Sequence, residues 1–214
     1  MILSKGKKSK LVTYFFPESL ISEQFRTIRT NIQFLTENRN QKLFLMTSPG
    51  KKEGKSTSIA NLAVSMVQQK HKVLLVDTNL RNPMIHQLFK VDNNEGLTDV
   101  LTGRLSFDDV AYSTGIGNLD LLTSGPVVNN PSELLGGEIM ENLLKKVCNQ
   151  YDVILVDAPP VLQSNESRLL ANLCDGVVLV ISRKKTDLRK VVEAKKVLDI
   201  VNATVVGAIM NTKR

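Results

Sequence analysis

The ten-residue segment Ser-Pro-Gly-Lys-Lys-Glu-Gly-Lys-Ser-Thr at 48–57 constrains the fold of this chain more than any other feature of its sequence. It follows the apolar run 43–47 and opens a helical pattern predicted over 55–69. A glycine-containing turn between a buried strand and a helix directs backbone N–H groups and the helix N-terminus at one point, and this arrangement binds phosphate. The sequence therefore predicts a phosphate-binding loop, with a plain strand-to-helix turn as the alternative.

Within this loop, Gly54-Lys55-Ser56 carries the chemistry. The Lys55 ammonium is expected to reach the β- and γ-phosphates of a nucleotide, and the Ser56 hydroxyl is expected to ligate Mg²⁺. The usual spacing asks for a glycine five residues before Gly54, where this chain has Pro49. The residues expected to contact the nucleotide are Gly50, Lys51, Lys52, Glu53, Gly54, Lys55, Ser56 and Thr57.

The rest of the chain alternates between short apolar runs and helical patterns, which is typical of a mostly parallel α/β sheet with helices on both faces. The expected strands are 43–47, 73–76, 119–122, 153–156, 177–181 and 205–209. The expected helices are 55–69, 132–150, 167–172 and 187–201, and the irregular part 78–118 is a candidate cover for the site. Together with the loop, this order predicts a P-loop NTPase fold over 21–214, preceded by a basic segment over 1–20.

Two of the expected strands end in an aspartate, Asp77 after 73–76 and Asp157 after 153–156. The carboxyl ends of parallel strands lie on the edge at which the phosphate-binding loop also opens. There the two carboxylates, together with Ser56, are expected to hold Mg²⁺ and its waters, or to accept a proton from an attacking hydroxyl. A single aspartate at such a position is more often a turn residue or a helix cap, so the prediction depends on the pair.

Further polar residues follow strand ends on the same side. Arg81 and the run Arg183-Lys184-Lys185 are candidates for contacts to nucleotide phosphates or to the acidic surroundings of an acceptor, and Arg81 is also a candidate catalytic residue. For the run, solvated loop charges are the alternative. Asn211, after the last strand, is a candidate for a hydrogen bond to an adenine edge, and a plain turn residue is the alternative.

Composition limits the classes of function. The net charge of +7 includes a cluster near the start, interpreted as a solvated tail with attraction to an anionic membrane surface as the alternative: Lys5, Lys7, Lys8 and Lys10. Nucleic-acid binding is not expected, because aromatic residues make up only 5% of the chain and none interleave these lysines. Cys148 and Cys174 lack a metal-binding spacing, which favours a reducing compartment, and no apolar run approaches the ~20 residues of a membrane span. A cytoplasmic protein is expected.

Near the start of the expected domain, Glu23, Arg26 and Arg29 fall on one arc of a predicted helix, while Phe25 and Ile28 lie on another. A solvated face with ion pairs and an oligomer contact both account for this spacing. The spacing alone does not select between them.

Taken together, these segments resemble the bacterial protein-tyrosine kinases (BY-kinases), in particular the separate cytoplasmic catalytic subunit of capsule and exopolysaccharide systems. The resemblance extends over 21–212. The matching segments are the E-x-x-R-x-x-R helix at 21–31, the Walker A segment at 48–57, the second acidic motif (A′) at 77–83, the stretches 119–126 and 130–134, and the Walker B segment at 156–160.

The resemblance implies a P-loop fold related to chromosome-partitioning and septum-placing ATPases, with Mg-ATP as phosphate donor and protein tyrosine as acceptor. It also implies a ring-like homo-oligomer, with Glu23, Arg26 and Arg29 as oligomer contacts, and a membrane adaptor protein that stimulates the kinase and recruits it to the inner face of the cell membrane. By the same resemblance, Lys55 stabilises the transferring phosphoryl group and Ser56 ligates Mg²⁺. Asp157 holds the water shell of the metal, and Asp77 is the base for the tyrosine hydroxyl.

Three features depart from the family pattern. Lys51-Lys52 stand where the family usually has Pro-Gly, Asn79 replaces the second aspartate of the A′ motif, and the sequence ends without the usual tyrosine-rich tail. The expected function is phosphate transfer from ATP to a tyrosine of a separate protein, in the regulation of capsular or exopolysaccharide synthesis. The alternatives are an ATP-hydrolysing molecular switch of the partitioning type and a nucleotide-stabilised scaffold in a polysaccharide assembly complex.

Overall fold

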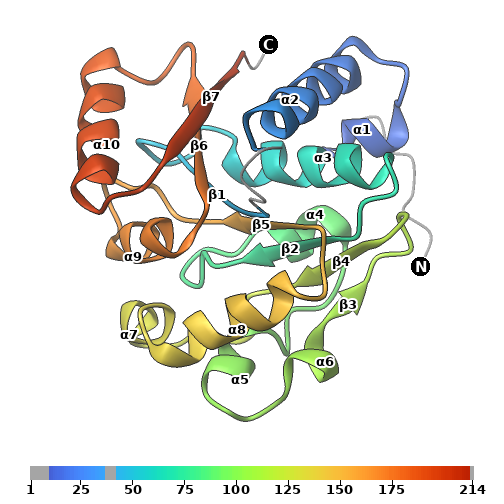
Figure 1. Cartoon of the computed structure of the whole chain (residues 1–214), viewed down its shortest axis with the longest axis vertical. Helices are drawn as coiled ribbons and strands as arrows, with labels where there is room; N and C mark the ends of the chain where they lie inside the picture. The colour runs from blue at the N-terminus through green and yellow to red at the C-terminus, as the bar shows by residue number, and fades with distance from the viewer. Residues whose placement is uncertain (1–9, 37–41, 213–214) are drawn as a thin grey trace.

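A computed structural model of the chain describes residues 10–36 and 42–212. Its elements follow one another along the chain as shown in Figure 1. The strands are β1 (Leu43–Thr47), β2 (Val73–Asp77), β3 (Tyr112–Ser113), β4 (Leu119–Leu122), β5 (Val153–Asp157), β6 (Gly176–Ser182) and β7 (Val205–Asn211). The helices are α1 (Val12–Phe15), α2 (Leu20–Thr36), α3 (Lys55–Val67), α4 (Ile85–Phe89), α5 (Leu97–Leu101), α6 (Phe107–Val110), α7 (Pro131–Leu135), α8 (Glu138–Cys148), α9 (Asn165–Leu173) and α10 (Leu188–Ile200).

The strands form one sheet in the order β3-β4-β2-β5-β1-β6-β7. All pairings are parallel except that of the two-residue strand β3, which runs antiparallel to β4 at one edge. The mostly parallel α/β sheet expected from the sequence is thus confirmed. Strand β1, which leads into the predicted phosphate-binding loop, lies between β5 and β6 and is buried along its whole length.

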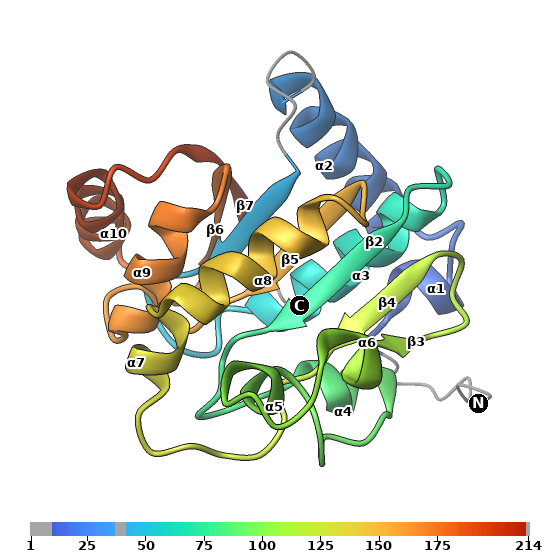
Figure 2. The ribbon, with the colours of Figure 1, turned by 60° about the horizontal axis from the view of Figure 1, so that its bottom comes forward.

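Two hydrophobic cores lie on opposite faces of the sheet, because successive side chains of a strand point to opposite sides. Along β1, Leu43 and Leu45 join one core, and Phe44 and Met46 join the other. Helices α2, α3 and α4 cover the second core, whereas α5 to α10 cover the first (Figures 1 and 2). This double cover explains why the strands are continuous apolar runs rather than alternating ones.

The predicted helix over 132–150 is wrong in one respect, since the structure divides it into α7 and α8. Gly136 caps the end of α7, and Gly137 is extended, with φ −85° and ψ 163°, before α8 begins. Two adjacent glycines weaken a helix because each loses more backbone freedom than other residues when it becomes helical. The segment 78–118 contains the short helices α4 to α6 and the strand β3, which the sequence pattern did not predict.

At the N-terminal side, helix α1 packs against α3. Leu11 is 1% exposed, and the backbone N–H of Thr13 donates a hydrogen bond of 2.9 Å to the side chain of Asn61. The segment from Leu11 to Thr13 is therefore packed against the body of the domain. Of the basic cluster near the start, Lys5, Lys7 and Lys8 lie outside the described residues.

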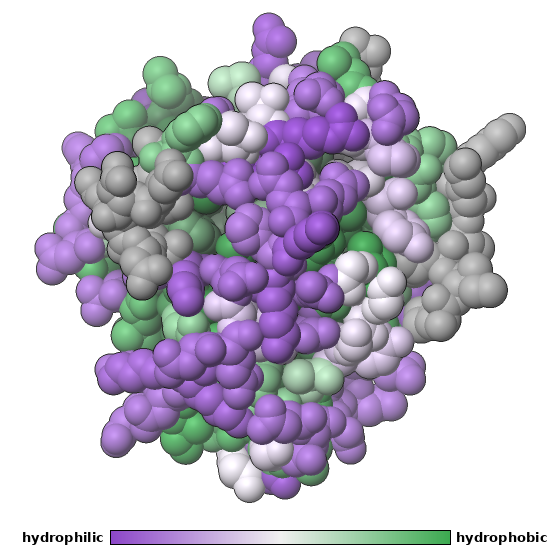
Figure 3. Space-filling model, turned by 45° about the vertical axis from the view of Figure 1, so that its right-hand side comes forward, coloured by the Kyte–Doolittle hydropathy of each residue, from purple (hydrophilic) through white to green (hydrophobic). Residues whose placement is uncertain are grey.

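Within the described ranges, no helix combines the length and the apolar character needed to cross a membrane. Hydrophilic side chains cover most of the face in Figure 3, and hydrophobic residues show on it in separate patches. Most of the large apolar side chains lie in the two cores.

Candidate active site

The loop between β1 and α3 has a tightly curled backbone. Gly54 caps α3 in the left-handed region, with φ +98°, and Lys52 is also left-handed at φ +59°. The Ser48 hydroxyl donates to the carbonyl of Gly50 at 2.6 Å, and the N–H of Gly50 donates to Glu53 Oε1 at 3.1 Å. These short-range bonds fold the loop over the start of α3, where free N–H groups and the helix dipole favour an anion.

Lys55, the first residue of α3, is 7% exposed although it carries a charged group. Burial lowers its pKa, while the nearby carboxylates of Asp157, Glu53 and Asp77 oppose that shift. The ammonium therefore lies in the same electrostatic environment as both strand-end aspartates, as the sequence predicted.

Asp157 ends β5, beside the phosphate-binding loop, and is fully buried. Among the described residues neither of its carboxylate oxygens has a hydrogen-bond partner. Burial and the neighbouring charge of Asp77 raise the pKa of Asp157 to about 7, although Lys55 and the Ser56 hydroxyl lower it. A buried carboxylate with two free oxygens next to a serine hydroxyl fits a hydrated divalent cation, because Mg²⁺ takes oxygen ligands and keeps several waters.

Asp77 ends β2 and is also fully buried, but its oxygens are occupied. Oδ1 accepts the N–H of Asn79 at 3.1 Å, and Oδ2 accepts those of Met84 and Ile85 at 2.9 and 3.0 Å. Burial raises the pKa of Asp77 to about 6 against the effect of these three bonds and of Lys55. The carboxylate thus fixes the start of the segment that follows β2.

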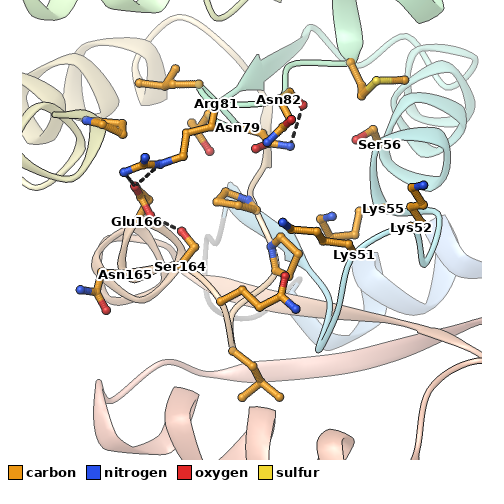
Figure 4. Close-up of a pocket in the computed structure, with 18 of the residues that line it drawn as sticks. Lys51, Lys52, Lys55, Ser56, Asn79, Arg81, Asn82, Ser164, Asn165 and Glu166 are labelled. Carbon is orange, nitrogen blue, oxygen red and sulfur yellow. Dashed lines mark hydrogen bonds and ion pairs between the residues drawn. The ribbon is translucent and has the colours of Figure 1, made fainter. Parts of the chain in front are cut away.

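A pocket of about 860 Å³ opens in front of this loop (Figure 4). The phosphate-binding loop forms one wall, residues 78–84 form a second, and the segment from Pro159 to α9 forms a third, with the start of α7 beside it. Its size is within the range of small-molecule sites. Of the predicted site residues, these line it: Lys51, Lys52, Gly54, Lys55, Ser56, Thr57 and Arg81.

Arg81 reaches across the pocket to Glu166 of α9, as Figure 4 shows. Its Nε and Nη2 atoms both lie 3.4 Å from Glu166 Oε1. Burial opposes ionisation of Glu166, but hydrogen bonds, among them one from Ser164, and the charge of Arg81 lower its pKa overall. Sequence reasoning missed Glu166, because only the fold brings the start of α9 opposite the segment after β2.

Asn79, which replaces the second acid of the A′ motif, also lines the pocket. Its side-chain amide donates to the carbonyl of Asn82 at 2.8 Å. In this position the residue closes a turn within the segment 78–84, on the wall that carries Arg81.

Asn211 is the last residue of β7, and its amide touches the phosphate-binding loop. Its Nδ2 atom donates to the carbonyl of Glu53 at 2.9 Å. From the basic run 183–185, the Lys185 ammonium donates to the carbonyl of Lys51 at 2.5 Å. The predicted contact of Asn211 with adenine stays a prediction, since the amide is engaged by the loop itself.

The three residues predicted as oligomer contacts differ in exposure. Glu23 and Arg26 form an ion pair on the surface of α2, with 60% and 30% of their side chains exposed. Arg29 is only 7% exposed, and its Nη1 atom donates to the carbonyl of Ser65 in α3 at 2.5 Å and to the Ser65 hydroxyl at 3.2 Å. Within the subunit the Arg29 guanidinium holds α2 against α3, and its role as an oligomer contact stays a prediction.

Comparisons with known proteins agree with this geometry. A family profile described as an AAA domain matches residues 51–206. Tyrosine-protein kinase YwqD of Bacillus subtilis (strain 168) is 42% identical over 218 residues, which cover all of this chain and 92% of the relative.

Among solved structures, the kinase domain of Escherichia coli tyrosine kinase ETK aligns with a TM-score of 0.91 and 28% identity, over 99% of this chain and 84% of that one. The septum site-determining protein MinD of Pyrococcus horikoshii OT3, complexed with Mg-ADP, aligns with a TM-score of 0.68 and 26% identity, over 79% and 70% of the two chains. With a phosphate-binding loop, two strand-end aspartates and near full-length similarity to a tyrosine-protein kinase, the chain belongs to the bacterial protein-tyrosine kinases, a branch of the P-loop fold.

Proposed function

We propose that this protein transfers the γ-phosphate of Mg-ATP to a tyrosine of a separate protein in the regulation of capsular or exopolysaccharide synthesis. The observation that carries the proposal is the buried carboxyl group of Asp157, whose oxygens have no hydrogen-bond partner in the described part of the chain and which lies in the electrostatic field of Lys55 at the start of α3. A carboxylate in that state is stabilised by a bound cation, and the helix N-terminus beside it favours the triphosphate that brings the cation.

Different residues around the pocket have different roles in the proposed reaction. Ser56 and Asp157 would hold the metal ion and its waters, and a metal ion there would supply positive charge beside the phosphates. The amides around Gly54 hold the phosphate oxygens. Lys55 stabilises the negative charge that develops on the transferring group, and its burial strengthens that interaction because water screens it less.

Asp77 is proposed as the base for the tyrosine hydroxyl. An ionised carboxylate has about four acceptor positions, and backbone N–H groups of residues 79, 84 and 85 use three of them. The remaining one is not used by these bonds, but Asp77 is 0% exposed and is not among the residues that line the pocket, so an acceptor hydroxyl reaches it only if the segment after β2 moves. A pKa of about 6 suits a base that works near neutral pH, since it is ionised there but still basic enough to take a proton.

The acceptor side chain enters beside the Arg81–Glu166 ion pair, where the pocket continues beyond the phosphate-binding loop. Tyr151 is 5% exposed, and its hydroxyl donates to Asp120 at 2.9 Å, so it does not serve as an acceptor in this fold. Burial does not exclude Tyr14 and Tyr112, which are 41% and 39% exposed, so an acceptor tyrosine on another protein chain rests on the resemblance to the family.

Two partners belong to this proposal, and both rest on the resemblance to the family. One is a membrane adaptor protein that activates the kinase and recruits it to the inner face of the cell membrane. The other is a set of further copies of the chain in a ring, for which the exposed pair Glu23 and Arg26 is a contact.

The test is a labelling experiment with γ-labelled ATP, Mg²⁺, a tyrosine-bearing acceptor and the cytoplasmic segment of the proposed membrane adaptor. Wild-type protein is compared with Lys55→Met and Asp157→Asn, and with Lys196→Met as a control that removes an exposed lysine of α10. Label on tyrosine with the wild type and the control, but not with the two site variants, supports the kinase. Free phosphate without labelled tyrosine would point to an ATP-hydrolysing switch. The absence of both products would point to a nucleotide-stabilised scaffold.

A further inference from the structure

The phosphate-binding loop is held from its outer side by two residues that lie far from it in the sequence. Strands β6 and β7 pair up to Ser182 and Asn211, and the N–H of Arg183 donates to the carbonyl of Asn211 at 3.1 Å. Their ends therefore form one hydrogen-bonded unit, which carries Asn211 and Lys185. We call these two residues the loop brace.

Asn211 lies directly against Gly54. A Cβ atom added to Gly54 would lie 2.2 Å from Asn211 Nδ2, which no real contact allows. The same Nδ2 atom donates to the carbonyl of Glu53, the residue before Gly54, at 2.9 Å. The glycine is thus required twice, by its φ of +98° and by the amide packed on it.

Lys185 makes the corresponding contact at the other end of the loop. Its ammonium donates to the carbonyl of Lys51 at 2.5 Å. Both members of the brace are donors, and both act on backbone carbonyls of the loop rather than on its side chains.

Because the peptide bond is planar, these two contacts also orient the backbone N–H groups of Gly54 and Lys52. In a trans peptide, the carbonyl of one residue and the N–H of the next point in opposite directions. When Asn211 draws the carbonyl of Glu53 outward, the N–H of Gly54 turns away from β7. When Lys185 draws the carbonyl of Lys51, the N–H of Lys52 turns away from the loop after β6. Gly54 and Lys52 both line the pocket.

We infer that Asn211 and Lys185 are positioning residues that orient the Gly54 and Lys52 amides toward a bound polyphosphate, so that Asn211 acts on the phosphate chain and not on the base. The inference rests on the proposed nucleotide site. By this inference, the site recognises a nucleotide mainly through its phosphates, and the identity of the purine base matters little.

The experiment compares binding of three Mg²⁺ complexes, those of ADP, GDP and inorganic tripolyphosphate, by calorimetry. Asn211→Asp keeps the size of the side chain but removes the donor, and Lys185→Met removes the ammonium. Each is expected to weaken all three ligands by a similar factor of about 3 to 10, the usual effect of one hydrogen bond, and to leave the ADP-to-GDP ratio unchanged. Lys196→Met removes an exposed lysine of α10 and is the control. Lys185→Arg, which keeps a cationic donor, should bind all three ligands as the wild type does.

A second measurement separates orientation of the amides from general loosening of the fold. In the wild type, tripolyphosphate should shift the amide resonances of Gly54 and Lys52, and Asn211→Asp should reduce the shift at Gly54 while the melting temperature of the free protein stays within about 2 °C, as for a change near the surface. A loss confined to ADP, with a lower ADP-to-GDP ratio, would make Asn211 a reader of the base and overturn the inference. Unchanged affinities in both variants would also overturn it. Wild-type protein that binds none of the three ligands would overturn the nucleotide site itself.

Discussion

Asp77 and Asp157 lie directly opposite each other, in register, at the ends of the neighbouring parallel strands β2 and β5. They share a position in the sheet but not an environment. The carboxylate of Asp77 accepts three backbone N–H groups, whereas both oxygens of Asp157 are without a partner among the described residues. The first is therefore a fixed group that organises a loop, and the second is a buried carboxyl group that the described part of the chain leaves unengaged.

Asp157 is expected to make the stability of the ligand-free protein depend on pH. Its pKa is about 7 in the folded chain and 3.8 in the absence of the fold. Between these values the folded state keeps a proton that the unfolded state has lost, so stability falls as pH rises from about 4 to 7 and stays low above. Asp157→Asn removes the titrating carboxyl group and with it the cost of ionising that group in the folded state. The variant should therefore raise the melting temperature at pH 8 by on the order of 5–10 °C, with a smaller gain at pH 5.

The control for this measurement is Asp92→Asn, which changes an exposed aspartate. Addition of Mg-ADP should reverse the order, since the cation stabilises the wild type but finds no carboxylate in Asp157→Asn. Equal stabilisation of both proteins by Mg-ADP would contradict the assignment of Asp157 to the metal.

Lys55→Met should abolish phosphate transfer while the chain stays folded. The side chain is almost fully buried, and methionine fills a similar space without the cost of a buried charge. Loss of a preorganised cation at the transferring group should lower the rate by about 10²- to 10³-fold or more. Single-turnover kinetics measure the loss, a melting curve checks the fold, and a residual rate within tenfold of the wild type would refute the role of Lys55.

Arg81→Ala should slow transfer with little effect on stability. The side chain is 63% exposed, so its pair with Glu166 contributes at most about 1 kcal/mol to folding. A guanidinium aimed at the acceptor side of the pocket should matter more to the reaction, and we expect a decrease in kcat of about 10-fold or more. Glu166→Gln, measured in parallel, tests whether the anchor of Arg81 is needed. The proposed role fails if kcat is unchanged in Arg81→Ala.

Asn79→Asp should increase turnover a few-fold at limiting Mg²⁺, because it returns to the A′ motif an acid that helps to order the metal. The substitution also removes the donor that now bonds to the carbonyl of Asn82, which frees the new carboxylate to turn into the pocket. Rates measured as a function of Mg²⁺ concentration check this expectation. Asn82→Asp adds the same charge to the same loop, and an equal gain there would show that only local charge matters.

Arg29→Met and Arg26→Met should separate folding from assembly. Arg29 bonds to Ser65 within the subunit, and its loss should cost about 2 kcal/mol or more of stability, which lowers the melting temperature by several degrees. Arg26 is at the surface, so its loss should leave the melting temperature almost unchanged but weaken self-association. Melting curves and sedimentation velocity measure the two effects. An unaltered melting temperature in Arg29→Met would contradict the structural role.

The strands and the positions of the two aspartates could be predicted from the sequence because both are local signals. Continuous apolar runs such as 73–76 mark strands covered on both faces, and a polar residue at the end of each run marks the sheet edge where the site opens. The order of strands then brings Asp77 and Asp157 together without further information. The short elements between residues 78 and 118 escaped prediction because four or five residues carry too little periodicity.

Contacts between distant segments were beyond the reach of the sequence. Glu166 opposite Arg81, and Lys185 and Asn211 on the phosphate-binding loop, depend on how helices and turns return to the sheet edge. Arg29 shows the same limit in another form. Its spacing with Glu23 and Arg26 suggested one exposed arc, but the curvature of a helix against its neighbour decides which residue of an arc is covered, and here α3 covers Arg29.

The order of the strands also fixes the spacing between the parts of the candidate site. Parallel neighbours lie about 4.8 Å apart, and the sheet sets β1, β5 and β2 side by side in that order. The strand that leads to the phosphate-binding loop, the strand that ends in Asp157 and the strand that ends in Asp77 are thus spaced in equal steps over roughly 10 Å. The hydrogen-bonding order of the backbone therefore already sets the order of the loop and of the two carboxyl groups along this edge of the sheet.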